Sequence, residues 1–137
     1  MKPSLLYRIA AVLILLFAAG HTSGYPWSDP TWGVDLTAMK STHFNVFGAS
    51  RTYWDFYVGF GLIGSVFLLL AAVLAWQLGG LPPDTLSRMR ATIWIFPLCF
   101  AANAVLAWKF IFIIPVVFSI AIAVCLAGAA ALSKKTS

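Results

Sequence analysis

Four stretches without a charged side chain divide this chain of 137 residues. They are 20, 28, 18 and 24 residues long and cover residues 9–28, 56–83, 91–108 and 110–133. A helix needs about 20 apolar residues to cross the ~30 Å hydrocarbon core of a bilayer. Charged residues make up 9% of the chain, whereas a soluble domain carries about 25%. The sequence therefore excludes an ordinary soluble domain and predicts four membrane-spanning helices.

The expected fold is an all-α, antiparallel bundle of four transmembrane helices in a single integral membrane domain, residues 1–137. The helices are predicted at about residues 5–21, 53–77, 91–107 and 112–132, with an outer cap at 22–52. Pro115 suits the first turn of the last helix, where its missing N–H has no helical partner to lose. Glycines and paired prolines predict a loop at residues 79–88.

The first apolar segment has an alternative interpretation. Its uninterrupted apolar run is short, two basic residues precede it, and Ala18 with Gly20 fits a cleavage site. Those features are also typical of a secretory signal peptide. We expect a retained helix, because the other three spans alone would put the two chain ends on opposite sides of the membrane.

Basic residues predict the orientation. One side of the membrane receives Lys2, Arg8, Arg88, Arg90, Lys134 and Lys135, and the other receives Lys40, Arg51 and Lys109. Cytoplasmic loops carry the excess of Lys and Arg, so both termini are expected in the cytoplasm. Tyr7 and several tryptophans fall near the span ends, where aromatic side chains anchor helices at the interface.

The segment between the first two spans, residues 20–55, holds both histidines and three of the four aspartates. Its apolar residues from 34 to 47 recur at helical spacing, which predicts a short amphipathic helix at the interface. Asp55 begins the second span. It complements the helix dipole and pairs with Arg51 in a structural interpretation, or it binds or moves a ligand in a functional one.

Six residues form the candidate ligand site. His21 ends the first span on the outer side, and Asn103 lies about six residues below the outer turn at Lys109. Helix bundles build ligand sites from side chains on facing helices, so these residues are expected to converge in the outer third of the bundle. The candidates are His21, Asp55, Asn103, Arg51, His43 and Tyr57.

No metal site and no cofactor are predicted. The two histidines are 22 residues apart and lack the compact spacing of a ligand motif. The chain contains no nucleophile–base motif or phosphate loop, so an enzyme is not favoured, although the question stays open. Nucleic acid is excluded as a partner, because no basic patch alternates with stacking aromatics.

Small residues recur along two spans. Ser119, Ala123, Ala127 and Ala131 are four residues apart, as are Gly61 and Ser65. Such rows let helix backbones approach closely in a membrane. We expect them to pack the helices of the bundle, with association of two copies as the alternative.

Three motifs resemble an uncharacterised family of small four-helix bacterial membrane proteins. They are GHTxG at residues 20–24, RTYWDFYxGFG at 51–61 and WQLG at 76–79. The resemblance implies four helices and no assigned activity. An arginine entering the first helix and a glycine ending it also look like DoxX-type proteins, some of which are linked to quinone-dependent sulfur oxidation. That likeness is architectural and transfers no catalytic residue.

The sequence therefore predicts a multi-pass protein of the bacterial inner membrane, acting as a binding or accessory component with an outward-facing polar pocket. The alternatives are a membrane redox or lipid- or quinone-modifying enzyme using the same pocket, and a purely structural subunit. Expected partners are the lipid bilayer and either a second copy or another membrane protein. No ligand is predicted for the pocket; a quinone or a lipid is what the enzyme alternative would use there.

Overall fold

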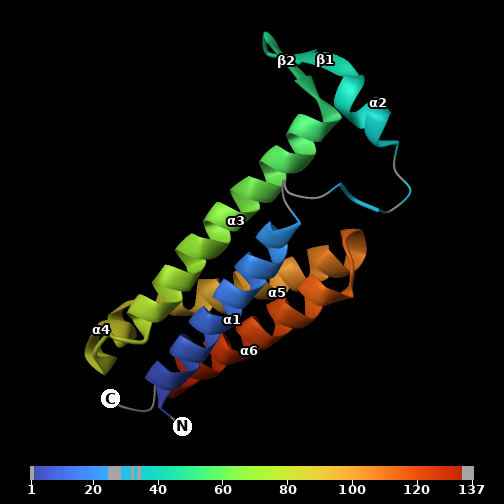
Figure 1. Cartoon of the computed structure of the whole chain (residues 1–137). Coiled ribbons are helices and arrows are strands. Elements are labelled where there is room, and N and C mark those ends of the chain that lie inside the picture. The colour runs from blue at the N-terminus through green and yellow to red at the C-terminus, as the bar shows by residue number, and fades with distance from the viewer. Residues whose placement is uncertain (1, 25–28, 32, 34, 134–137) are drawn as a thin grey trace. The chain divides into compact units, whose positions relative to one another are not determined.

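The computed structural model describes residues 2–24, 29–31, 33 and 35–133. Lys134 and Lys135, which contribute to the predicted orientation, and Val34 of the predicted amphipathic helix lie outside these residues. Figure 1 shows the elements α1 (Pro3–Ser23), α2 (Leu36–Ser41), β1 (His43–Val46), β2 (Ala49–Thr52), α3 (Tyr53–Leu78), α4 (Pro83–Arg88), α5 (Arg90–Phe110) and α6 (Ile113–Ser133).

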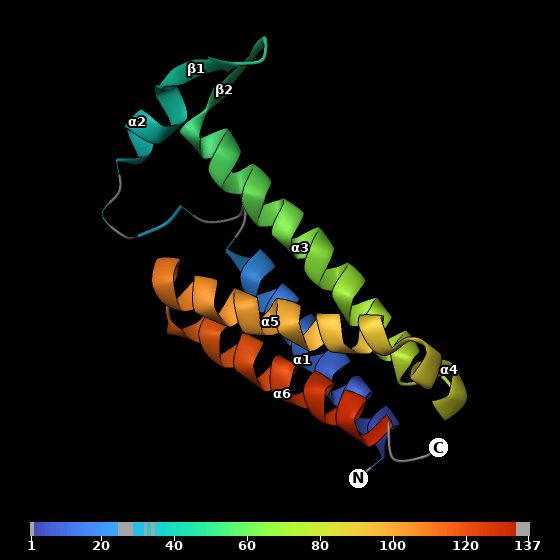
Figure 2. The ribbon, with the colours of Figure 1, turned by 180° about the vertical axis from the view of Figure 1, so that it is seen from behind.

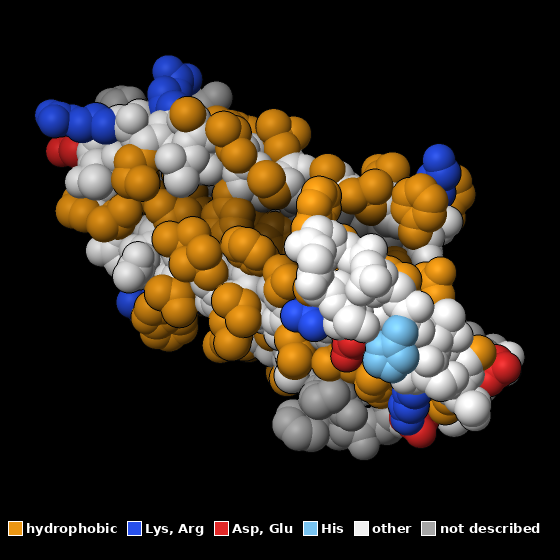
Figure 3. All heavy atoms as spheres, turned by 90° about the horizontal axis from the view of Figure 1, so that it is seen from above, with side chains coloured by type: hydrophobic (Ala, Val, Ile, Leu, Met, Phe, Trp, Pro, Cys, Tyr) orange, Lys and Arg blue, Asp and Glu red, His pale blue; other side chains and the backbone are white. Residues whose placement is uncertain are grey.

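Four helices of the described chain are long and apolar enough to cross a membrane: α1, α3, α5 and α6. Only 22% to 39% of the residues in their most apolar windows are buried, so most of their side chains face outward. In Figure 3, hydrophobic side chains cover much of the visible surface. The predicted fold class is confirmed, and the chain is a multi-pass membrane protein with four candidate spans.

Contacts divide the chain into two compact units. The bundle unit comprises Met1–Phe17 and Leu68–Ser137, and the hairpin unit comprises Ala18–Phe67. The bundle unit contains parts of all four spans, and its core includes the fully buried Tyr7, Ile93 and Ile122. The two units share the helices α1 and α3, each of which runs from one unit into the other.

Helices α5 and α6 form an antiparallel pair within the predicted bundle. Only residues 111 and 112 join them, and they make the most extensive contact of any pair of elements (Figures 1 and 2). Pro115 lies in the first turn of α6, as predicted. The predicted loop at 79–88 is partly wrong, because it contains α4. Pro83 begins this helix and Asp84 occupies its first turn, which are favourable positions for both residues.

The predicted row of small residues on α6 only partly matches the buried face. Ser119 is fully buried, whereas Ala131 is exposed. Four residues turn an α-helix by about 400°, which is about 40° more than one full turn. Residues spaced four apart therefore move around the helix and off its buried face. The buried residues instead follow steps of three and four: Val116, Ser119, Ile122, Leu126, Ala129, Ala130 and Ser133. Gly61 and Ser65 on α3 are both buried, as expected.

The predicted amphipathic helix ends early. Asp35 caps α2 by accepting a hydrogen bond from the Ala38 N–H at 2.9 Å, and the helix stops at Ser41. The next residues form the antiparallel hairpin β1–β2. Its two-residue turn consists of Phe47 and Gly48, at φ angles of 47° and 84°. Two successive residues with positive φ reverse the chain in the twist that a hairpin favours.

Phe47 occupies this left-handed position with a fully exposed side chain. The left-handed conformation costs a non-glycine residue about 1–2 kcal/mol, and asparagine tolerates it best. Phe47→Asn is therefore expected to stabilise the hairpin by about 1 kcal/mol. Hydrogen exchange of the β1 and β2 amides in detergent measures this change. Phe47→Leu is the control and should leave protection unchanged; equal protection in the Asn and wild-type proteins would contradict the prediction.

Candidate functional site

Asp55 is held at the start of α3 by a reciprocal capping box. The Thr52 N–H donates to Asp55 Oδ2 at 2.8 Å, and the Asp55 N–H donates to the Thr52 hydroxyl at 3.1 Å. Each side chain thereby satisfies an N–H that the helix start leaves without a partner. The structural interpretation of Asp55 as an acid of the first turn is confirmed in this form.

The expected ion pair between Asp55 and Arg51 is absent from the described residues. The Arg51 guanidinium donates instead to the Ser50 carbonyl oxygen at 2.8 Å. The expectation assumed helical spacing between the two residues, but Arg51 lies in the extended strand β2. The structure nevertheless places both side chains at the rim of the same pocket.

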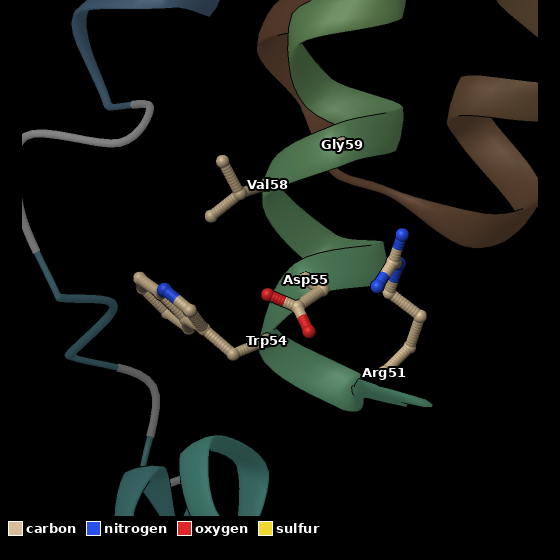
Figure 4. A pocket seen from close by; sticks show the side chains of 5 residues that line it. All are labelled: Arg51, Trp54, Asp55, Val58 and Gly59. Carbon is tan, nitrogen blue, oxygen red and sulfur yellow. The ribbon is translucent and has the colours of Figure 1, made fainter. Parts of the chain in front are cut away.

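That pocket has a volume of about 310 Å³. It is lined by Arg51, Trp54, Asp55, Val58 and Gly59. Four of them form two pairs four residues apart on α3, and such pairs lie on one side of a helix. Figure 4 shows the Asp55 carboxylate between the Trp54 and Arg51 side chains, with Val58 one turn further along the helix. The positive Arg51 and the negative Asp55 therefore border the same pocket.

Trp54 is fixed by its neighbours. The Lys40 ammonium lies 4.5 Å from the centroid of the indole, and the same ammonium pairs with Asp29 at 2.8 Å. The Tyr57 ring stacks against Trp54, with centroids 5.4 Å apart. The indole thus forms a supported wall of the pocket, and its π-face is already engaged by a cation.

A cluster of aromatic rings packs the β1–β2 hairpin against α3. The Phe44 ring of β1 lies 4.9 Å from that of Tyr53 and 5.4 Å from that of Phe56, measured between centroids. Phe56 in turn contacts Phe60. Because β2 runs directly into α3, this packing also fixes the backbone that carries Arg51.

The two histidines are not among the residues that line the pocket. His21 Nε2 lies 3.0 Å from the Gly61 carbonyl oxygen of α3. Gly61 follows Asp55 by six residues, or about 9 Å along the helix axis. His43 Nδ1 lies 3.3 Å from the Ser50 hydroxyl on the neighbouring strand. Both rings therefore join elements of the hairpin unit.

Next to His21, two hydroxyls continue the contact between α1 and α3. The Thr22 hydroxyl lies 2.8 Å from that of Ser65, which is itself 3.2 Å from the Gly61 carbonyl oxygen. A chain of hydrogen bonds of this kind is a common way of joining helices in a membrane.

Asn103 belongs to the bundle unit. Its side-chain amide donates to the hydroxyl of the buried Ser119 at 2.8 Å and so links α5 to α6. Of the six candidate residues, the structure brings Arg51 and Asp55 together in the pocket, and Tyr57 supports its Trp54 wall. The sequence analysis did not propose Trp54, Val58 or Gly59 as site residues. Each is one, three or four residues from Asp55 on a predicted helix, so this spacing could have identified them.

The pocket offers a guanidinium and a carboxylate, and its five lining residues include no serine, cysteine, histidine or lysine nucleophile. Within the described ranges, no three His, Cys, Asp or Glu side chains lie close enough together to hold a metal ion. The arrangement is suited to binding a group that carries both charges. Comparisons with models of known protein families, with curated proteins and with solved structures found no match for this chain.

Proposed function

We propose that this protein is a membrane-embedded binding component whose pocket at the start of α3 takes a phosphoethanolamine group. The observation that carries the proposal is the placement of Arg51 and Asp55 around one pocket of about 310 Å³. That volume is at the lower end of the range of ligand pockets, about 300–1,000 Å³. A small zwitterion matches both its size and its paired charges.

The hydrogen bonds indicate which end of the ligand each residue holds. The Asp55 carboxylate accepts from Thr52 through Oδ2, and a carboxylate has further acceptor sites for an ammonium. Arg51 uses one N–H on Ser50, and a guanidinium has five in a geometry that suits phosphate. The phosphate therefore belongs at Arg51 and the ammonium at Asp55.

Trp54 favours a primary ammonium over choline. A quaternary ammonium has no N–H to donate and is recognised through the faces of aromatic rings. The Lys40 ammonium already lies over the indole of Trp54. A primary ammonium needs only the carboxylate of Asp55, so we expect selection of ethanolamine over choline.

The length of α3 supports a lipid as the source of this group. Its 26 residues extend about 39 Å at 1.5 Å per residue, more than the ~30 Å of the hydrocarbon core. The first turns of α3 then lie at the level of the lipid headgroups. A free phosphoethanolamine in solution offers the same chemistry without the acyl chains.

The membrane and its sidedness are part of the proposal. We place both termini in the cytoplasm and the pocket on the outer face of a bacterial inner membrane, in one integral membrane domain, on the distribution of basic residues. The likeness to DoxX-type proteins is one of architecture and contributes no ligand.

The test is binding to the purified full-length chain. Titration with O-phosphoethanolamine, and incorporation into phosphatidylethanolamine nanodiscs, should raise the melting temperature, whereas phosphocholine and phosphatidylcholine should not. Asp55→Asn keeps a side-chain oxygen for the Thr52 N–H and removes the charge. It is expected to weaken binding about tenfold or more, since charge-assisted hydrogen bonds are the strong ones.

Asp84→Asn is the matched control, because it removes the same charge from α4 and should leave affinity unchanged. A response to the nanodisc lipid alone identifies a lipid site, and a response to both probes identifies a headgroup site. Equal binding of the choline compounds, or unchanged affinity in Asp55→Asn and Arg51→Gln, would refute the proposal.

A further inference from the structure

A second pocket lies in the bundle unit, where α1 begins and where α3 and α6 end. Its volume is about 260 Å³. Its walls include the apolar Leu78, Leu81 and Leu86 and the polar Lys2, Ser4 and Ser133. In Figures 1 and 2 the start of α1, the helix α4 and the end of α6 lie at the same end of this unit. Because three spans begin or end here, the pocket lies at a membrane surface.

The described residues at this end of the bundle unit are mainly basic. Lys2, Arg8, Arg88 and Arg90 lie here against a single acid, Asp84, which gives a net charge of 4 − 1 = +3. The Arg8 guanidinium lies 5.1 Å from the centroid of the Trp76 ring, a position typical of a side chain at the interface. Charge therefore favours an anionic ligand at the polar wall of the pocket.

Tyr7 lies behind the polar wall of the pocket and does not line it. Its side chain is 1% exposed, and Ser133 is the polar side chain near enough to interact with its hydroxyl. The Ser133 hydroxyl donates to the Ala129 carbonyl oxygen at 2.8 Å, so its one proton is already used. Lys2 and Ser4 are therefore the residues of the polar wall that can donate to an anion.

We propose that this pocket binds one anionic phospholipid. An acyl chain lies against Leu78, Leu81 and Leu86, and the phosphate lies at Lys2 and the Ser4 hydroxyl. Basic pockets between spans are a known form of anionic-lipid recognition. The proposal is independent of the phosphoethanolamine site, because the two pockets share no lining residue and select headgroups of different charge.

The experiment compares phosphatidylglycerol, phosphatidylcholine and inorganic phosphate as additives to the full-length protein in detergent, with melting temperature and native mass spectrometry as readouts. Phosphatidylglycerol should raise the melting temperature and give a one-lipid adduct. Lys2→Gln changes an exposed side chain and should weaken this binding about tenfold, as expected for one charge-assisted contact.

Lys109→Gln is the control, because it removes the same charge from the other end of α5, about 28 Å from Arg90 along the helix. An equal loss in Lys109→Gln would show that affinity reflects overall charge, and would overturn the proposal. It is likewise overturned if phosphatidylcholine acts as strongly as phosphatidylglycerol. An equal response to inorganic phosphate would mean that a free anion, rather than a lipid, occupies the site.

Discussion

Gly79→Ala is expected to lower the free energy of unfolding by about 1–3 kcal/mol, the usual cost of overpacking a tight contact. Gly79 directly follows α3 and is buried. A Cβ atom there would meet the Ser4 carbonyl oxygen at 3.1 Å and the Tyr7 Cβ at 3.2 Å. Both belong to the rigid part of α1, so the start of α1 and the end of α3 must separate. Thermal unfolding in detergent measures the loss.

Gly128→Ala is the matched control. Its Cβ would meet an atom at a similar distance, 3.2 Å, but that atom is the Leu6 Cδ1 at the end of a flexible side chain. Leu6 can move, and alanine is favoured over glycine within a helix, so stability should change little. Gly80→Ala should also be mild, because its nearest neighbour is at 3.4 Å. If all three variants lost the same free energy of unfolding, the close contact between α1 and α3 would not be the reason for a glycine at position 79.

Tyr7→Ala is expected to cost about 3–5 kcal/mol, the range for truncating a large aromatic side chain in a core. Tyr7 is the largest fully buried side chain of the described residues. It packs in the bundle unit, so its removal leaves a cavity between the spans. The measurement is the free energy of unfolding in detergent, and a loss below about 1 kcal/mol would contradict this account of the core.

Tyr7→Phe separates the ring from its hydroxyl. The ring keeps its packing, and the variant no longer buries a hydroxyl that lacks a partner. An unsatisfied buried polar group costs about 1–3 kcal/mol, so lipid-free Tyr7→Phe should be as stable as the wild type or more stable. A lower stability of Tyr7→Phe would show instead that the hydroxyl is hydrogen-bonded to the nearby Ser133.

Asp55 shows that the structural and functional interpretations of one residue need not exclude each other. Its Oδ2 and N–H complete the capping box with Thr52, while its carboxylate also faces the pocket with Arg51. The cap fixes the position of the acid, which is what a binding site requires of its charged groups. The Asp55→Asn test depends on this separation, because the amide retains the cap and loses only the charge.

Two predictions from the sequence were wrong: the exposure of Tyr7 and the conformation of residues 43–47. Tyr7 was expected at the interface because it lies near a span end, yet it is buried in the bundle unit. Position along a helix predicts depth in the membrane, but only packing determines which way a side chain faces. His43, Val46 and Phe47 have helical spacing, but the positive φ angles at residues 47 and 48 make them part of a hairpin.

The sequence by itself determined the four spans and placed their ends within three residues of those in the structure. A bilayer imposes the same requirement on every spanning helix, about 20 residues without exposed charge, so the thirteen charged residues were enough to indicate four spans, although α1 and α3 both begin before their charge-free stretches. The tertiary structure alone decided which small residues lie in helix contacts, how residues 43–52 pair, and which side chains share a pocket. Those features depend on contacts between residues distant in sequence, and spacing along one helix carries no information about its neighbours.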